Sequence, residues 1–205
     1  MQWMKKSLIL CVILSLLTAC SFGPGKLPPV NSYLFAVKQP KQRAKPLTKS
    51  TLEILPMQAN ADYAGTEFIY RVKGSRYLSD YYHVFLVDPP SQLAEITESY
   101  LENSSIFTYV SSEAVLSKSF EFILKPSLQL LYADYRNPAK PKAVVAMRFI
   151  LLDNDPYKKK IVLNKVYSQA IPLAAKTNVA LVAAWNRGLK NIYRQLSVDI
   201  RSIVR

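Results

Sequence analysis

The spacing of hydrophobic residues changes several times along the chain, and each change marks a predicted element. Short runs of alternating, aromatic or β-branched residues predict strands over residues 31–37, 51–55, 66–72, 77–85 and 107–110. Longer runs of the same kind predict strands over residues 120–136, 143–153 and 161–171. The turn sequence Asp153-Asn154-Asp155-Pro156 joins the last two strands as a hairpin.

Two segments instead repeat apolar residues every three or four positions, as an amphipathic helix does. The first opens at Asp88-Pro89-Pro90 and runs to Asn103. The second is capped by Thr177 or Asn178 and carries a long apolar stripe. The stripe consists of Leu181, Val182, Trp185, Leu189, Ile192, Leu196, Ile200 and Ile203. Because an amphipathic helix must cover its apolar face, the order of elements predicts an α+β fold: a mixed, largely antiparallel sheet with two helices packed on one face.

The N-terminus has the three parts of an export signal. Lys5 and Lys6 supply positive charge, and residues 7–17 form an apolar run too short to span a bilayer, which takes about 20 residues. Leu17-Thr18-Ala19-Cys20 then has the form of a lipobox, in which the Cys20 thiol takes up diacylglycerol before cleavage. We therefore predict a signal peptide over residues 1–19 and lipidation at Cys20; an uncleaved anchor or an ordinary secretory signal is the alternative.

The predicted processing sets the location and the organisation of the mature chain. Cys11 leaves with the signal and Cys20 becomes a thioether, so no disulfide is expected. Ser21 follows the cysteine where an aspartate would favour the inner membrane, so we expect the periplasmic face of the outer membrane, with that of the inner membrane as the alternative. The Gly- and Pro-containing residues 20–30 form the lipidated N-terminus and a flexible tether, and residues 31–205 form a single α+β domain.

The chain is strongly basic, with a formal net charge of +13. This balance favours an acidic partner such as lipid head groups or another protein, and export argues against nucleic acid; a solvated basic surface is the other interpretation. Residues 39–50 contain four basic residues and no acid and are expected to form a loop. The run Lys158-Lys159-Lys160 lies at the predicted hairpin tip, where charges are usually solvated.

The sequence gives little support for catalysis. His83 is its one histidine, whereas a zinc site needs three or four His, Cys or carboxylate ligands. No Gly-x-Ser-x-Gly motif is present, and Glu95 and Glu98 are spaced to face water on the first helix. We therefore expect no catalytic residue, no metal and no cofactor; a hydrolase that uses His83 is retained as a rival hypothesis.

Several motifs, in order, resemble a known family. They are Tyr63-Ala64-Gly65-Thr66, Phe68-Ile69-Tyr70-Arg71, Asp88-Pro89-Pro90, Leu130-Leu131-Tyr132-Ala133-Asp134-Tyr135, Ala143-Val144-Val145-Ala146-Met147-Arg148-Phe149 and Ala183-Ala184-Trp185-Asn186. Behind a lipobox, this series is similar to the PqiC-like auxiliary lipoproteins of ABC-type transporters that work with MCE (mammalian cell entry) proteins. The stretch Tyr81-Tyr82-His83-Val84-Phe85 departs from the family, in which a tryptophan is expected there.

The resemblance implies a fold similar to the N-terminal domain of TolB. It also implies a non-catalytic component of a system that moves lipids or other hydrophobic molecules between the inner and outer membranes. The partners would be an MCE-domain protein and, through it, an ABC ATPase and permease, with the lipid anchor in the membrane and a homo-oligomer as a further possibility. The alternative is a structural envelope lipoprotein that binds the cell wall or the outer-membrane assembly machinery.

Docking requires an exposed sheet edge or an aromatic surface patch. The residues that we expect to form such a patch are Tyr70, Tyr77, Tyr81, Tyr82 and Phe85. Aromatic residues on strands also commonly belong to the core, so a core position is the alternative for each of them.

Overall fold

The structure is a computed structural model, which describes residues 27–42, 45–113 and 119–204. Its strands are β1 (Asn31–Tyr33), β2 (Thr51–Ile54), β3 (Gln58–Ala59), β4 (Glu67–Lys73), β5 (Arg76–Phe85), β6 (Tyr109–Ser111), β7 (Phe122–Asp134), β8 (Lys142–Asp153) and β9 (Lys160–Pro172). Its helices are the short 3-10 helix η2 (Ala61–Tyr63), α2 (Pro89–Asn103) and α3 (Asn178–Ile203).

The long strand β7 organises the sheet. On one side it pairs antiparallel with β8 along its whole length, and β8 pairs in the same way with β9. On its other side the short strands β2, β3 and β4 follow one another, all parallel to β7. β5 adds antiparallel to β4, β1 adds parallel to β5, and β6 adds parallel to β2. The mixed, largely antiparallel sheet predicted from the sequence is therefore confirmed.

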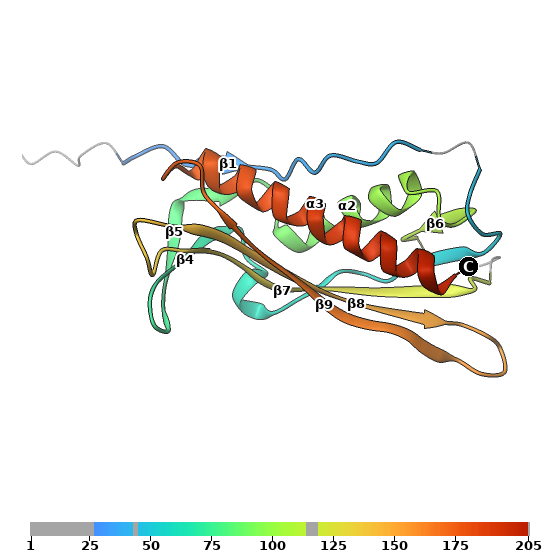
Figure 1. The fold of residues 1–205 in the computed structure, drawn as a ribbon. Coiled ribbons are helices and arrows are strands. Elements are labelled where there is room, and N and C mark those ends of the chain that lie inside the picture. Colours follow the sequence, from blue (N-terminus) through green and yellow to red (C-terminus); the bar gives the residue numbers. More distant parts are fainter. Residues whose placement is uncertain (1–26, 43–44, 114–118, 205) are drawn as a thin grey trace, which may run out of the picture.

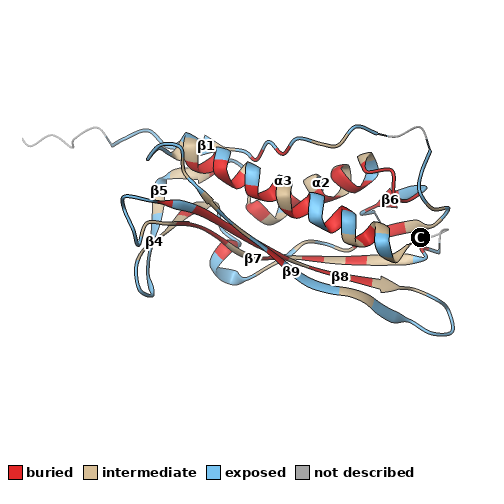
Figure 2. Ribbon diagram, in the orientation of Figure 1, coloured by how far each residue is buried: buried red, intermediate tan, exposed pale blue. Residues whose placement is uncertain are grey.

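Both long helices lie on one face of this sheet, as predicted (Figure 1). α3 packs on β8 and β9, and α2 lies beside it against β6 and β7. The predicted stripe of α3 is buried in this layer except for Ile203, which is half-buried at the last turn (Figure 2). Gly188 allows the close approach, because a Cβ at this position would lie 2.9 Å from Cγ1 of Val145.

Both helices begin where their capping residues predict. Asp88 caps α2 by accepting a hydrogen bond from the backbone N–H of Ser91, and Thr177 caps α3 by accepting from Ala180. The helices contact each other through Tyr193, whose hydroxyl lies 2.9 Å from Oγ1 of Thr97. These caps fix the residue at which each helix begins.

The first predicted strand, over residues 31–37, is shorter in the structure. β1 ends at Tyr33 because the next backbone groups bond to helix side chains: Phe35 N–H donates to Oε1 of Gln92 at 2.8 Å, and Ala36 N–H donates to Oδ1 of Asn186 at 2.9 Å. Phe35 and Val37 are still buried, so the alternating pattern of residues 31–37 predicted the burial of these side chains correctly but not the extent of strand pairing.

The short elements β3 and η2 were not predicted, because neither is long enough to show a period.

Candidate functional site

A large bulge interrupts β5 in the middle of its length. Asp80 lies opposite Phe68 of β4, but the next paired position, Glu67, lies opposite Val84. Tyr81, Tyr82 and His83 therefore lie between two consecutive positions of the neighbouring strand. A bulge bends a strand and changes the direction of its side chains, so this segment leaves the regular alternation of β5.

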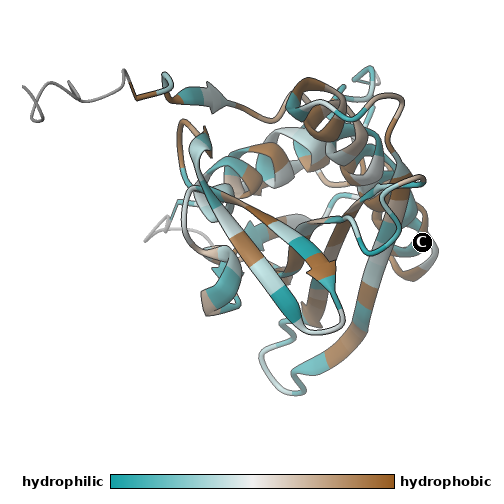
Figure 3. Ribbon diagram, turned by 90° about the vertical axis from the view of Figure 1, so that its left-hand side faces the viewer, coloured by the Kyte–Doolittle hydropathy of each residue, from teal (hydrophilic) through white to brown (hydrophobic). Residues whose placement is uncertain are grey.

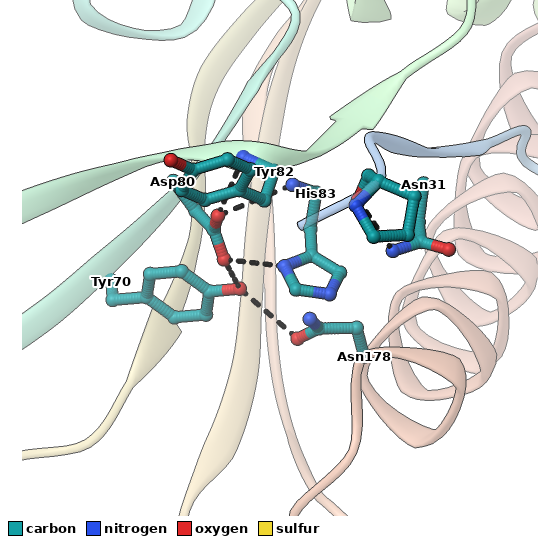
Figure 4. Close-up of polar contacts among 7 residues, drawn as sticks. Asn31, Tyr70, Asp80, Tyr82, His83 and Asn178 are labelled. Atoms are coloured by element: carbon teal, nitrogen blue, oxygen red, sulfur yellow. Dashed lines mark hydrogen bonds and ion pairs between the residues drawn. The ribbon is translucent and has the colours of Figure 1, made fainter. Parts of the chain in front are cut away.

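Asp80 holds the bulge in place (Figure 4). Its carboxylate accepts hydrogen bonds from the backbone N–H groups of Tyr82, at 2.9 Å, and His83, at 3.2 Å. The same carboxylate lies 2.8 Å from Nδ1 of His83 and accepts from the hydroxyl of Tyr70 at 2.9 Å. The Tyr70 hydroxyl also lies 3.0 Å from Oδ1 of Asn178, the first residue of α3. One carboxylate thus connects β4, the bulge of β5 and the start of α3.

The electrostatics agree with these contacts. Burial on its own raises the pKa of Asp80, but the hydrogen bonds from Tyr82, His83 and Tyr70 outweigh it and lower that pKa below the usual range of an aspartate. Burial and the hydrogen bond to Asp80 raise the pKa of Tyr70 far above the usual range of a tyrosine. Asp80 is therefore charged at neutral pH, and Tyr70 remains a proton donor to it.

The bulge separates two of the predicted patch residues from a third. Tyr81 is 72% exposed and Tyr82 is 38% exposed, and the exposed Leu86 and Val87 follow at the end of the strand. Phe85 is only 2% exposed, so the prediction that it contributes to a surface patch is wrong. Its ring packs in the core, with centroids 4.8 Å from Phe35, 4.7 Å from Phe68 and 5.6 Å from Trp185.

The other two predicted patch residues lie on different faces of the sheet. Tyr70 is half-buried on the side of the helices, where it bonds to α3. Tyr77, paired with the next residue of β4, is on the opposite face, where its ring contacts Tyr132 at 5.7 Å and the Arg71 guanidinium at 5.5 Å. The five aromatic residues therefore do not form one patch; Tyr81 and Tyr82 are the exposed pair at the β5 edge.

An apolar hollow that the sequence did not reveal lies beside this edge. It has a volume of about 380 Å³ and is lined by Tyr70, Val72, Leu78, Tyr135 and Pro138. Tyr135 and Pro138 come from the turn between β7 and β8, far from β4 and β5 in the sequence. No local pattern marks such a site, because the sheet topology alone brings these segments together.

Asp80 and His83 form an arrangement that resembles part of a catalytic triad. An aspartate that orients a histidine can activate a hydroxyl nucleophile. Within residues 27–42, 45–113 and 119–204, however, no serine, threonine or cysteine hydrogen-bonds to the His83 ring. The same residues contain no group of three His, Cys, Asp or Glu side chains that could hold a metal ion. The contacts that the pair does make hold the bulge.

The predicted lipidation site Cys20 and sorting residue Ser21 lie outside the described residues, and both remain predictions. The lysine run 158–160 is exposed near the tip of the β8–β9 hairpin. Within the described part of the chain, no helix has the length and apolar character needed to cross a membrane.

Comparisons with known proteins find similarity at the level of structure. No family model and no curated protein matches the chain. The fold is similar to that of protein XCC0632 from Xanthomonas campestris, of family DUF330, with a TM-score of 0.71 and 15% identity over 84% of this chain and 98% of that one. An uncharacterized protein has a TM-score of 0.63 and 12% identity, over 80% of this chain and 99% of that one. The hypothetical protein CT253 from Chlamydia trachomatis has a TM-score of 0.56 and 10% identity, over 77% of this chain and 98% of that one. The chain therefore shares the fold of these proteins.

Proposed function

We propose that this protein is a non-catalytic lipoprotein of an MCE-type ABC transport system, which moves lipids or other hydrophobic molecules between the inner and outer membranes. It acts as a docking module, anchored through Cys20 on the periplasmic face of the outer membrane. The observation that carries the proposal is the exposed pair Tyr81 and Tyr82 on the pinned bulge of β5. The motif series of the sequence and the fold shared with a DUF330 protein support it.

The bulge suits docking because it is rigid. The backbone N–H groups of Tyr82 and His83 are bonded to Asp80, so the backbone that carries Tyr81 and Tyr82 is held in place before a partner arrives. A pre-organised backbone loses little conformational entropy on binding, and an aromatic side chain adds only two torsion angles that must be ordered. The anchor adds to this effect, because it confines the domain to a thin layer beside the membrane and raises its effective concentration there.

Co-purification in mild detergent tests the docking function. The full lipidated protein should retain an MCE-domain protein. The double variant Tyr81→Ser, Tyr82→Ser should reduce the retained amount about tenfold or more, because aromatic side chains that become buried in an interface often contribute most of its binding energy. Tyr157→Ser is the matched control, because Tyr157 is 98% exposed at the opposite end of the sheet. Equal retention by the double variant and the wild type would contradict the proposed surface.

Two further measurements separate this function from its rivals. Retention of peptidoglycan or outer-membrane assembly factors, with no MCE-domain protein, would favour the structural envelope lipoprotein instead. His83→Ala tests the hydrolase: we expect transport to continue with a wild-type substrate profile, whereas complete loss in a stably folded variant that still retains the MCE-domain protein would indicate catalysis.

A further inference from the structure

One end of the sheet is defined by a row of residues paired across five strands. Tyr77 of β5 pairs with Arg71 of β4, which pairs with Asp134 of β7. Asp134 pairs with Lys142 of β8, which pairs with Pro172 of β9. The β4–β5 turn, the β7–β8 turn and the β9–α3 connection lie beyond this row. We call residues 71–78, 134–142 and 172–179 the tether end.

The tether end concentrates positive charge. It contains seven basic residues and one acidic residue, Asp134, and so has a formal net charge of +6. The basic residues are Arg71, Lys73, Arg76, Arg136, Lys140, Lys142 and Lys176. All of them except the half-buried Arg71 are exposed, and Asp134 is paired with Arg136 at 2.6 Å. A charge of this size in a small area favours a polyanionic surface.

Apolar side chains are exposed among these charges. Tyr77, Leu78 and Val179 belong to the tether end, and each exposes a large part of its side chain. The apolar hollow beside β5 opens in the same region, because Val72, Leu78, Tyr135 and Pro138 line it. Basic and aromatic side chains together are typical of surfaces that lie at the head-group level of a bilayer.

The direction of the chain brings this end toward the membrane. β1 runs parallel to β5, with Asn31 opposite His83, so the chain before Asn31 leaves toward the end at which β5 begins. In Figure 1, residues 27–30 leave on the same side of the view as the β4–β5 turn; Figure 3, which looks onto that side, shows them at the upper left, above the β4–β5 hairpin. The C-terminus of α3 lies at the opposite end (Figure 1).

The length of the tether permits contact. Arg76 is seven residues before His83 along β5, which corresponds to about 23 Å in a strand. Cys20 is eleven residues before Asn31, and an extended segment of that length reaches about 36 Å. A chain anchored at Cys20 can therefore place the tether end on the bilayer surface.

We propose that the tether end binds the anionic phospholipid head groups of the membrane that holds the anchor. This inference rests on the lipid anchor of the proposed function. It gives the domain a fixed orientation, with the β4–β5 turn on the bilayer, the β8–β9 hairpin away from it, and Tyr81 and Tyr82 close to the membrane surface.

The test uses the full lipidated protein in nanodiscs. Because Cys20 carries lipid, Ser75→Cys in the β4–β5 turn introduces a single free thiol for a fluorophore, and Lys159→Cys does the same at the opposite end. With nitroxide-labelled head groups, we expect strong quenching at position 75 and little at position 159 in discs that contain phosphatidylglycerol. Quenching at position 75 should fall in discs of phosphatidylcholine alone and in high salt.

Charge variants complete the test. The triple variant Lys73→Gln, Arg76→Gln and Lys140→Gln should lower the ratio of docked to undocked domain on the order of 100-fold, because each basic residue near an anionic surface contributes roughly fivefold. The matched control neutralises Lys158, Lys159 and Lys160 and should leave quenching at position 75 unchanged. Equal quenching at positions 75 and 159, or no effect of the triple variant, would overturn the inference.

The result is independent of the docking function. Recovery of protein in the nanodiscs reports the anchor, quenching reports the orientation, and retention of an MCE-domain protein reports docking. Loss of quenching leaves retention measurable, and loss of retention leaves quenching measurable, whereas failure to recover the protein in the nanodiscs would overturn the anchor on which this inference rests.

Discussion

The two ends of the sheet use similar residues in different ways. At the β8–β9 hairpin, Asp155 accepts hydrogen bonds from the backbone N–H groups of Tyr157 and Lys158, all within one exposed turn. Toward the tether end, Asp80 accepts two backbone N–H groups in the same manner, but it also bonds to His83 and to Tyr70 of another strand. The same local motif is a solvated turn at one end and a junction of three elements at the other.

The net charge also differs between the two ends of the sheet. Residues 153–160 contain three lysines and two aspartates, for a net charge of +1, whereas the tether end has a net charge of +6. A basic run is therefore a poor guide to function unless the acids that surround it in space are counted as well. Of the two ends, the one at which the chain leaves toward its predicted anchor has the larger net positive charge.

The largest expected effect comes from removing Asp80, and removal of Asp155 is the comparison. Asp80→Ala leaves two backbone N–H groups, the His83 ring and the Tyr70 hydroxyl without their acceptor, and we expect it to lower the free energy of unfolding by about 2–4 kcal/mol. Asp155→Ala removes an exposed acceptor and should cost less than about 1 kcal/mol. Urea denaturation measures both, and equal losses would show that Asp80 is no more than a turn residue.

A smaller effect is expected from the link between β4 and α3. Tyr70→Phe keeps the ring but removes the hydroxyl that contacts Asp80 and Asn178, so it should lower the free energy of unfolding by about 1 kcal/mol. Val179→Ala, at an exposed position next to Asn178, is the control and should change stability by less than about 0.5 kcal/mol. A Tyr70→Phe protein as stable as the wild type would mean that the junction does not depend on this hydroxyl.

The pH dependence of stability isolates the charge of Asp80. Its pKa is lowered in the folded state, so the unfolded chain takes up the proton more readily. The charged carboxylate therefore stabilises the fold above the unfolded-state pKa of about 3.9, and this contribution is lost as the pH falls through the folded-state pKa. We expect the stability difference between wild type and Asp80→Asn to shrink between pH 5 and pH 3, measured by urea denaturation; a difference that grows on acidification would reverse the assignment.

The sequence predicted the elements whose signals are local. The stripe on α3, the caps at Asp88 and Thr177, and the β8–β9 turn each follow from spacing or from one residue type, and the structure confirms them. The strand pattern of 77–85 was also right in extent, but it did not show that residues 81–83 leave the ladder. After the bulge, β5 pairs with β4 on one side and with β1 on the other, and the contact with β1 joins segments that are distant in the sequence.

The burial of Phe85 also depends on contacts between distant segments, so the local sequence did not predict it. As an aromatic residue at the end of an aromatic strand, it is indistinguishable in sequence from Tyr81 and Tyr82. Its burial follows from Trp185 on α3 and Phe35 on the segment after β1, more than 40 residues away on either side. Only the register that follows the bulge assigns the three rings to the core or to the surface.

The smallest expected effect on stability comes from replacing an exposed tyrosine at either end. Tyr81 and Tyr157 are exposed tyrosines on opposite sides of the molecule, and neither ring packs in the core. Tyr81→Ser and Tyr157→Ser should each change the free energy of unfolding by less than about 0.5 kcal/mol, because surface substitutions away from caps and networks rarely do more. If thermal unfolding confirms both values, a loss of partner retention specific to Tyr81→Ser must come from the removed ring itself, since the two variants would be equally well folded. A marked loss of stability in Tyr81→Ser alone would instead assign that ring to the structure of the bulge.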